Sequence, residues 1–267
     1  MAVGVAAVLD RYSVRHDLQA PRVRFGILWF GALLVSLVGG SFGVAALFAV
    51  VCSISALQVA GAWRGARAPV NQPLAAIAAG LAPLASWIGN TWSGLALLAF
   101  AALAVVLGPA RRLDAKALNK GVIATNWTAA SATLRSGFFV AFVGTAVVQI
   151  HRVDSLMLLF LLAACCVYDS GDYLCGAGYR NRIIGPLAGS FGVLVVTMSM
   201  TAIRLDPLSS GQVWAFGFAF AILCPLGQLF GSWILPSSRA AVPGLRRLDT
   251  WLLAAPFFWI GLELVGR

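Results

Sequence analysis

Charged side chains are scarce in this chain of 267 residues: Asp, Glu, Lys and Arg together make up 10% of it. A soluble domain usually has about a quarter, so this scarcity excludes an ordinary soluble enzyme. Hydrophobic residues make up 60%, and nine Trp and sixteen Phe stand among the apolar runs. That composition is typical of a polytopic membrane protein, and the length suffices for about eight to ten spans of roughly 20 residues.

Acidic residues are the rarer of the charges, with 9 Asp and Glu against 19 Lys and Arg, for a net charge of +10. No acid occurs between Asp17 and Asp114. In a soluble protein such an excess of bases would suggest nucleic acid as a partner. Here the arginines lie between apolar runs, where they meet anionic lipid headgroups. We therefore expect the lipid bilayer as a partner and no nucleic acid.

Patterns for disulfides and for histidine-based metal sites are also lacking. An odd number of cysteines without any CxxC pair gives no complete disulfide framework, and we interpret them as small buried hydrophobes. His16 and His151 lie far apart in the sequence, which disfavours a histidine metal site. The cysteines are Cys52, Cys165, Cys166, Cys175 and Cys224.

We predict an all-α fold, in which residues 23–267 form a single transmembrane domain of about nine helices around a central cavity. The preceding segment 1–22 is expected on the cytoplasmic side or at the interface, either as an amphipathic helix or as a partly ordered tail, and it has no cleavable signal-peptide pattern. The stretch 119–149 is too long for one untilted span and fits either a long kinked helix or a helix with a re-entrant piece. The predicted helices are 23–40, 42–62, 72–89, 91–108, one within 119–149, 154–173, 183–203, 212–235 and 250–265.

The placement of the bases predicts the orientation. With nine spans, most Lys and Arg residues fall in the N-terminal segment and in alternate loops, on one side of the membrane. The positive-inside rule then places the N-terminus in the cytoplasm and the C-terminus outside an inner or cytoplasmic membrane. The loops on the cytoplasmic side are also the longer and more polar ones, so we expect any chemistry on that face.

An acidic pair closes the apolar run before residue 173. Asp169 and Asp172, three residues apart, share one helix face, with Tyr168 before them and Arg180 and Arg182 after them. Carboxylates at the end of a membrane helix are candidates for function, and this pair could hold a hydrated Mg²⁺, which prefers oxygen ligands and bridges to phosphates. The alternative is a solvated helix end whose acids pair with the two arginines.

Two further sets of polar residues have a functional and a structural interpretation. The loop GPARRLDAKALNK, residues 108–120, could grip a diphosphate through its bases, or could reflect membrane orientation alone. Its bases are Arg111, Arg112, Lys116 and Lys120. Polar residues inside the spans could line the cavity or bond a neighbouring helix; they are Gln58, Asn126, Thr128, Gln149 and Gln228.

Three segments together resemble the UbiA superfamily of intramembrane prenyltransferases. The stretch YDSGDYLCGAGYRNRIIGPLAGSFG (168–192) resembles the family's second Asp motif. The stretch ARAPVNQPLAAIAAG (66–80) resembles the loop after its first Asp motif, and ARRLDAKALNKGVIATNWTAAS (110–131) its basic connection into the fifth helix. The resemblance implies a bundle of nine spans with a lateral portal to lipid, and prenyl transfer from a prenyl diphosphate to a lipophilic acceptor.

In such an enzyme, Asp169 and Asp172 would hold Mg²⁺ and Tyr168 would orient the acceptor or quench a cation. The bases of residues 108–120, with Arg180 and Arg182, would bind the diphosphate, and Gln58 and Asn126 would line the cavity. The metal offsets charge on the leaving group, and the apolar bundle keeps water from the isoprenoid.

The chain departs from the family where the first Asp motif should fall, near SALQVAGAW (55–63), which contains no acid. Two function classes therefore stay open. One is an atypical prenyltransferase that uses Mg²⁺. The other is a catalytically degenerate relative that binds a quinone, pigment or lipid, or serves as a subunit of a membrane complex with a protein partner. A transporter or channel is disfavoured because no internal repeat and no matched pair of broken helices is visible.

Overall fold

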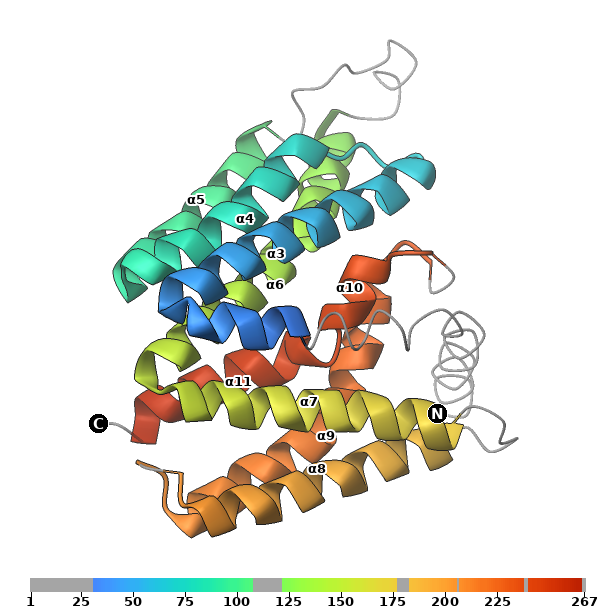
Figure 1. Ribbon diagram of the computed structural model, residues 1–267. Helices are drawn as coiled ribbons and strands as arrows, with labels where there is room; N and C mark the ends of the chain where they lie inside the picture. The colour runs from blue at the N-terminus through green and yellow to red at the C-terminus, as the bar shows by residue number, and fades with distance from the viewer. Residues whose placement is uncertain (1–30, 108–121, 177–182, 206, 238–239, 266–267) are drawn as a thin grey trace. The chain divides into compact units, whose positions relative to one another are not determined.

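The computed structural model describes residues 31–107, 122–176, 183–205, 207–237 and 240–265. Throughout these ranges the regular secondary structure is helical, which confirms the predicted all-α class. Residues 31–38 are helical and precede α3. The labelled helices are α3 (Gly40–Gly65), α4 (Gln72–Ile88), α5 (Asn90–Leu107), α6 (Val122–Val153), α7 (Ser155–Gly176), α8 (Ile184–Ile203), α9 (Ser210–Ile234), α10 (Pro243–Leu248) and α11 (Trp251–Val265) (Figure 1).

Six of the described helices are long and apolar enough to cross a membrane, which indicates an integral membrane protein. They are α3, α5, α6 from Trp127 onward, α7, α8 and α9. Helices α4 and α11 are apolar but shorter, with 17 and 15 residues. The spans differ in how much of their most apolar stretch is buried inside the protein: 67% in α6, but only 22% in α5 and 17% in α8. Most side chains in the apolar stretches of α5 and α8 are therefore not buried inside the protein.

The described part of the long stretch 119–149 belongs to one continuous helix, α6, which begins at Val122. Helix α6 has 32 residues, or about 48 Å at 1.5 Å per residue. A hydrocarbon core is about 30 Å thick, so α6 is longer than one untilted span. The sequence left open either a long helix or a helix with a re-entrant piece, and in the described residues the structure shows the single long helix.

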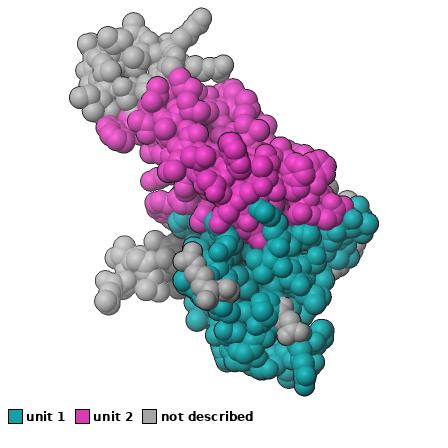
Figure 2. Space-filling view, turned by 90° about the vertical axis from the view of Figure 1, so that its left-hand side faces the viewer, with its two compact units in different colours: residues 1–38, 150–232, 249–267 teal, residues 39–149, 233–248 magenta. Residues whose placement is uncertain are grey.

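The chain folds into two compact units, coloured separately in Figure 2. Unit 2 comprises residues 39–149 and 233–248, and therefore α3, α4, α5, most of α6 and α10. Unit 1 comprises residues 1–38, 150–232 and 249–267, and therefore α7, α8, nearly all of α9 and α11.

Small residues set the packing of unit 2, in which α4 lies between α3 and α5 (Figure 1). A side chain at Gly144 of α6 would meet Pro83 of α4 and Cys52 of α3, and one at Gly137 would meet the ring of Phe100 on α5. Helices approach this closely in membranes only where such residues face each other. Polar side chains add bonds between helices: the Gln149 side chain on α6, for example, donates to the Ser86 carbonyl of α4 at 3.2 Å.

Unit 1 has an aromatic centre formed by α7, α9 and α11. Phe258 of α11 contacts three rings, with centroid distances of 4.8 Å to Phe216, 5.1 Å to Phe220 and 5.9 Å to Phe160. Phe160, Phe220 and Phe258 are fully buried. Edge-to-face pairs of this kind contribute about 0.5–1.5 kcal/mol beyond the area that they bury. The aromatic centre thus joins three helices that are distant in sequence.

Helix α10 was not predicted, because its six residues are too few for a periodic pattern. Pro243 stands at its first turn, where proline's fixed φ and missing N–H suit a helix start. Leu245 and Leu248 are buried, and α10 packs against α3.

Candidate functional site

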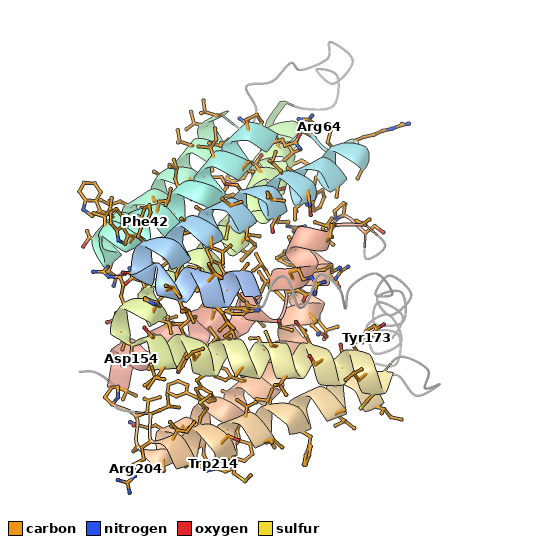
Figure 3. All side chains as sticks on the ribbon, in the orientation of Figure 1. Phe42, Arg64, Asp154, Tyr173, Arg204 and Trp214 are labelled. Atoms are coloured by element: carbon orange, nitrogen blue, oxygen red, sulfur yellow. The ribbon has the colours of Figure 1, made fainter. Side chains whose placement is uncertain are left out.

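The predicted acidic pair lies on the last two turns of α7, at the end that Tyr173 marks in Figure 3 and opposite to Asp154. Asp172 is buried, with 2% of its surface exposed, and Asp169 is half-buried. The pair is therefore enclosed by protein instead of extending freely into water. Arg180 and Arg182, which the sequence suggested as ion-pair partners, lie outside the described residues.

A glutamine of α9 bridges the two carboxylates. The Nε2 of Gln228 lies 3.4 Å from Oδ1 of Asp169 and 3.3 Å from Oδ2 of Asp172. The hydroxyl of Thr250, just before α11, donates to Oδ2 of Asp169 at 3.4 Å. These four residues, which we call the polar cluster, join α7, α9 and the start of α11. Gln228 thus bonds neighbouring helices, as one of its two interpretations predicted.

Glycines of α8 let the acidic end of α7 pack closely. A side chain at Gly185 would meet Oδ1 and the backbone of Asp172, and one at Gly189 would meet the backbone and ring of Tyr168. Tyr168 is fully buried against this face. The glycines stand four residues apart, the spacing that brings two membrane helices into direct backbone contact. Helix α8 therefore holds Tyr168 and Asp172 in fixed positions.

Sequence reasoning missed the contribution of residues 249 and 250: it left Asp249 in a loop and gave Thr250 no role beyond the first residue of the predicted helix 250–265. Asp249 and Thr250 are fully buried, and the backbone of Asp249 packs on Gly227 of α9. A signal was present: an Asp-Thr pair directly before an apolar run is typical of a helix start, and Gly227 and Gly231 of α9 have the spacing of a helix-packing face. These two signals together could have placed Thr250 beside α9.

The oxygen atoms of the polar cluster are suited to a hard cation or to hydrogen-bond donors of a ligand. Two carboxylates, one hydroxyl and one side-chain amide converge there. Among the described residues, no group of three or more His, Cys, Asp and Glu side chains is arranged so that it could hold a metal ion. Mg²⁺ bound here would therefore rely on two carboxylates, neutral oxygens and water, a set that Mg²⁺ accepts mainly where a phosphate completes it.

In unit 2, the segment in which the resemblance requires acids is occupied by protein contacts. Gln58 accepts a hydrogen bond from the backbone N–H of Gly244 at 2.7 Å through its side-chain oxygen. A side chain at Gly244 would meet the hydroxyl of Ser55. Gln58 thus satisfies one of the N–H groups that the start of α10 leaves without an intrahelical partner.

Several predicted site residues lie outside what the structure describes. The bases Arg111, Arg112, Lys116 and Lys120 belong to the segment 108–121, and Arg180 and Arg182 to 177–182. Asn126 lies in α6, but its side chain is outside the described residues. The diphosphate-binding role of the bases and the cavity-lining role of Asn126 remain predictions.

Compared with models of known protein families and with curated proteins, the chain matches none of them.

Proposed function

We propose that this chain is an integral membrane protein that binds a lipophilic molecule, an isoprenoid, a quinone or another lipid, whose polar end contacts the polar cluster of unit 1. The observation that supports this is the bridge of Gln228 between Asp169 and Asp172 among apolar helices. Carboxylates are costly inside a membrane domain and mark functional sites there. This bridge and the contact of Gln58 with α10 leave both expected metal-binding positions engaged with protein groups, which favours ligand binding without catalysis.

The architecture that we propose with it is a UbiA-like bundle of about nine spans around a central cavity, with a cytoplasmic N-terminus. In its support, the described helices follow the predicted apolar runs in order, apart from the short α10. The excess of bases in alternate loops supports the orientation. A protein partner in a membrane complex is compatible with the lipid-facing surfaces of α5 and α8.

A second candidate function is Mg²⁺-dependent prenyl transfer, and one atom favours it. Oδ1 of Asp172 is buried and accepts no hydrogen bond from the described residues. It could therefore serve a metal that Asp169 and Asp172 hold together. Mg²⁺ would supply charge compensation for the departing diphosphate, while Tyr168 and the glycines of α8 would fix the geometry of the acidic pair.

The two candidates are separated by Asp172→Asn. The protein is purified from native membranes into nanodiscs, and the molecules that stay bound are identified by native mass spectrometry with lipid extraction. Hydrogen bonds to charged groups contribute about 1.5–3 kcal/mol, so we expect the variant to retain a bound lipophilic molecule at least about tenfold less well. Asp154→Asn is the matched control: Asp154 caps the other end of α7 through the Leu156 N–H, and asparagine caps equally well.

Pyrophosphate release from a prenyl diphosphate with Mg²⁺ is measured on the same preparations. Ligand binding without catalysis predicts no release by the wild type. Release that Asp172→Asn abolishes and Asp154→Asn preserves, together with a prenylated acceptor in the lipid extract, would establish prenyl transfer instead of ligand binding alone. A wild type that retains no lipophilic molecule and releases no pyrophosphate would refute both candidates.

A further inference from the structure

An arginine lies inside one of the candidate spans. Arg135 belongs to α6, within the apolar stretch Trp127–Val153. Its guanidinium carbon lies 4.6 Å from the ring centroid of Trp233 and 5.7 Å from that of Trp63. Arginine is rare in membrane helices and is kept there where it meets a partner. The indole rings of Trp63 and Trp233 stabilise Arg135, because the π-system of an indole attracts a cation.

The local structure holds this arrangement in place. The indole N–H of Trp63, near the end of α3, donates to the Ile234 carbonyl at 3.1 Å. Phe139 lies one turn after Arg135 on the same face of α6. Its ring packs edge-on against that of Trp233, with 6.4 Å between the two ring centroids. Gly137, which points away from that face, packs against Phe100 of α5 and fixes the rotation of α6. We call Trp63, Arg135 and Trp233 the arginine clamp.

No carboxylate of unit 2 neutralises the arginine clamp in the part of the chain that the structure describes. That part of unit 2, residues 39–107, 122–149, 233–237 and 240–248, contains no Asp or Glu. Arg64 and Arg67 follow Trp63 and are exposed, which adds positive charge at the end of α3. The described part of unit 2 therefore supplies cations but no carboxylate at the clamp, and such a cationic site suits an anionic ligand.

The chemistry of the side chains indicates which anion fits. The indoles attract the guanidinium through its charge, and its five N–H donors lie in one plane, where two of them match two oxygens of a phosphate. Tryptophan prefers the headgroup level of a bilayer, where phosphate is the prevailing anion and basic residues are attracted to it.

We propose that the arginine clamp binds the phosphate group of an anionic amphiphile at the membrane interface. This site lies in unit 2, its residues are not those of the polar cluster, and it does not depend on the proposed function. Arg135 supplies the bidentate contact. Trp63 and Trp233 hold the guanidinium and pack against the apolar part of the ligand next to the phosphate.

The test compares phosphatidylglycerol with phosphatidylcholine on delipidated full-length protein, by native mass spectrometry and by thermal stabilisation on lipid titration. We expect wild-type protein to prefer phosphatidylglycerol, Arg135→Gln to lose about tenfold in apparent affinity, and Arg135→Lys to lose less because it keeps only the charge. Arg204→Gln is the matched control, since Arg204 is exposed at the end of α8 in unit 1. Its affinity should equal that of the wild type.

A second variant covers the case in which Arg135→Gln fails to fold. Trp233 is 45% exposed, so Trp233→Leu should be tolerated while it weakens phosphatidylglycerol binding several-fold. Competition by millimolar pyrophosphate would show that the clamp also accepts a free phosphate group. Binding that depends on Arg135 but resists pyrophosphate would assign the site to the lipid headgroup. Equal phosphatidylglycerol affinity in the wild type, Arg135→Lys and Trp233→Leu would overturn the proposal.

Discussion

Replacing the bridging glutamine by glutamate should make the stability of the protein depend on a divalent cation. Gln228 is 1% exposed, and its Nε2 lies 3.3–3.4 Å from one oxygen of Asp172 and one of Asp169. Gln228→Glu keeps the shape but puts a third carboxylate there. At an effective dielectric constant of about 20, each such contact costs up to about 5 kcal/mol, and loss of the donor adds about 1–3 kcal/mol.

The assay is thermal unfolding in nanodiscs, with chelator and with Mg²⁺ or Ca²⁺. At about 2–4 °C per kcal/mol for a chain of this size, the variant in chelator should unfold at least about 10 °C below the wild type, and by several tens of degrees if the full cost applies. Three carboxylates with neutral oxygens form a set that a divalent cation can bind. A cation at a hundred times its Kd would restore about 2.7 kcal/mol, or several degrees.

Gln149→Glu is the matched control for this prediction. Gln149 is also buried, at 5% exposure, but it donates to the Ser86 carbonyl, and the described part of its unit has no carboxylate. It should lose stability without recovery in Mg²⁺ or Ca²⁺. If Gln228→Glu in chelator unfolded at the wild-type temperature, or responded to cations no more than Gln149→Glu, the amide would not lie between the two carboxylates.

Two further predictions concern packing in unit 1. Gly189→Val should separate α7 from α8, because the valine side chain would overlap Tyr168, and overpacking of this kind costs about 1–3 kcal/mol. The control is Gly94→Val, since no atom lies within 4 Å of a side chain added at Gly94. Equal unfolding temperatures for the two variants would contradict the contact between Gly189 and Tyr168. Phe258→Ala should remove the ring that contacts the three others of the aromatic centre, at a cost of about 3–5 kcal/mol in stability. Phe191 is 69% exposed, so the stability of Phe191→Ala should stay close to that of the wild type. Calorimetry in nanodiscs measures both variants, and similar losses of stability would refute the central role of Phe258.

The helical class and most helix positions could be predicted, because long apolar runs have few alternatives in a membrane. The exceptions have physical reasons. Helix α10 is too short for a periodic signal, and the choice between one helix and a re-entrant piece in 119–149 depends on packing against distant segments. Hydrophobicity alone does not encode either feature.

The candidate site divides in the same way. Asp169 and Asp172 could be identified as an acidic pair at the end of an apolar helix from local sequence alone. Their contacts with Gln228 and Thr250 join residues 56 to 81 positions apart, and one sequence does not reveal which helices are neighbours. The arginine clamp escaped prediction for the same reason, since Trp63 and Trp233 are distant from Arg135 in the sequence.

The unequal burial of the spans has a consequence for how this sequence can diverge over evolutionary time. On α8 and α5, most side chains of the apolar stretch are not buried inside the protein, and where they face acyl chains one apolar residue can replace another with little change in free energy, since acyl chains have no fixed shape to match. On α6, two thirds of the most apolar stretch is buried against protein, so each exchange must fit a defined volume. Related sequences should therefore exchange apolar residues readily in α5 and on the unburied face of α8, while α6 and the glycines of α8 that face α7 preserve the size of their residues.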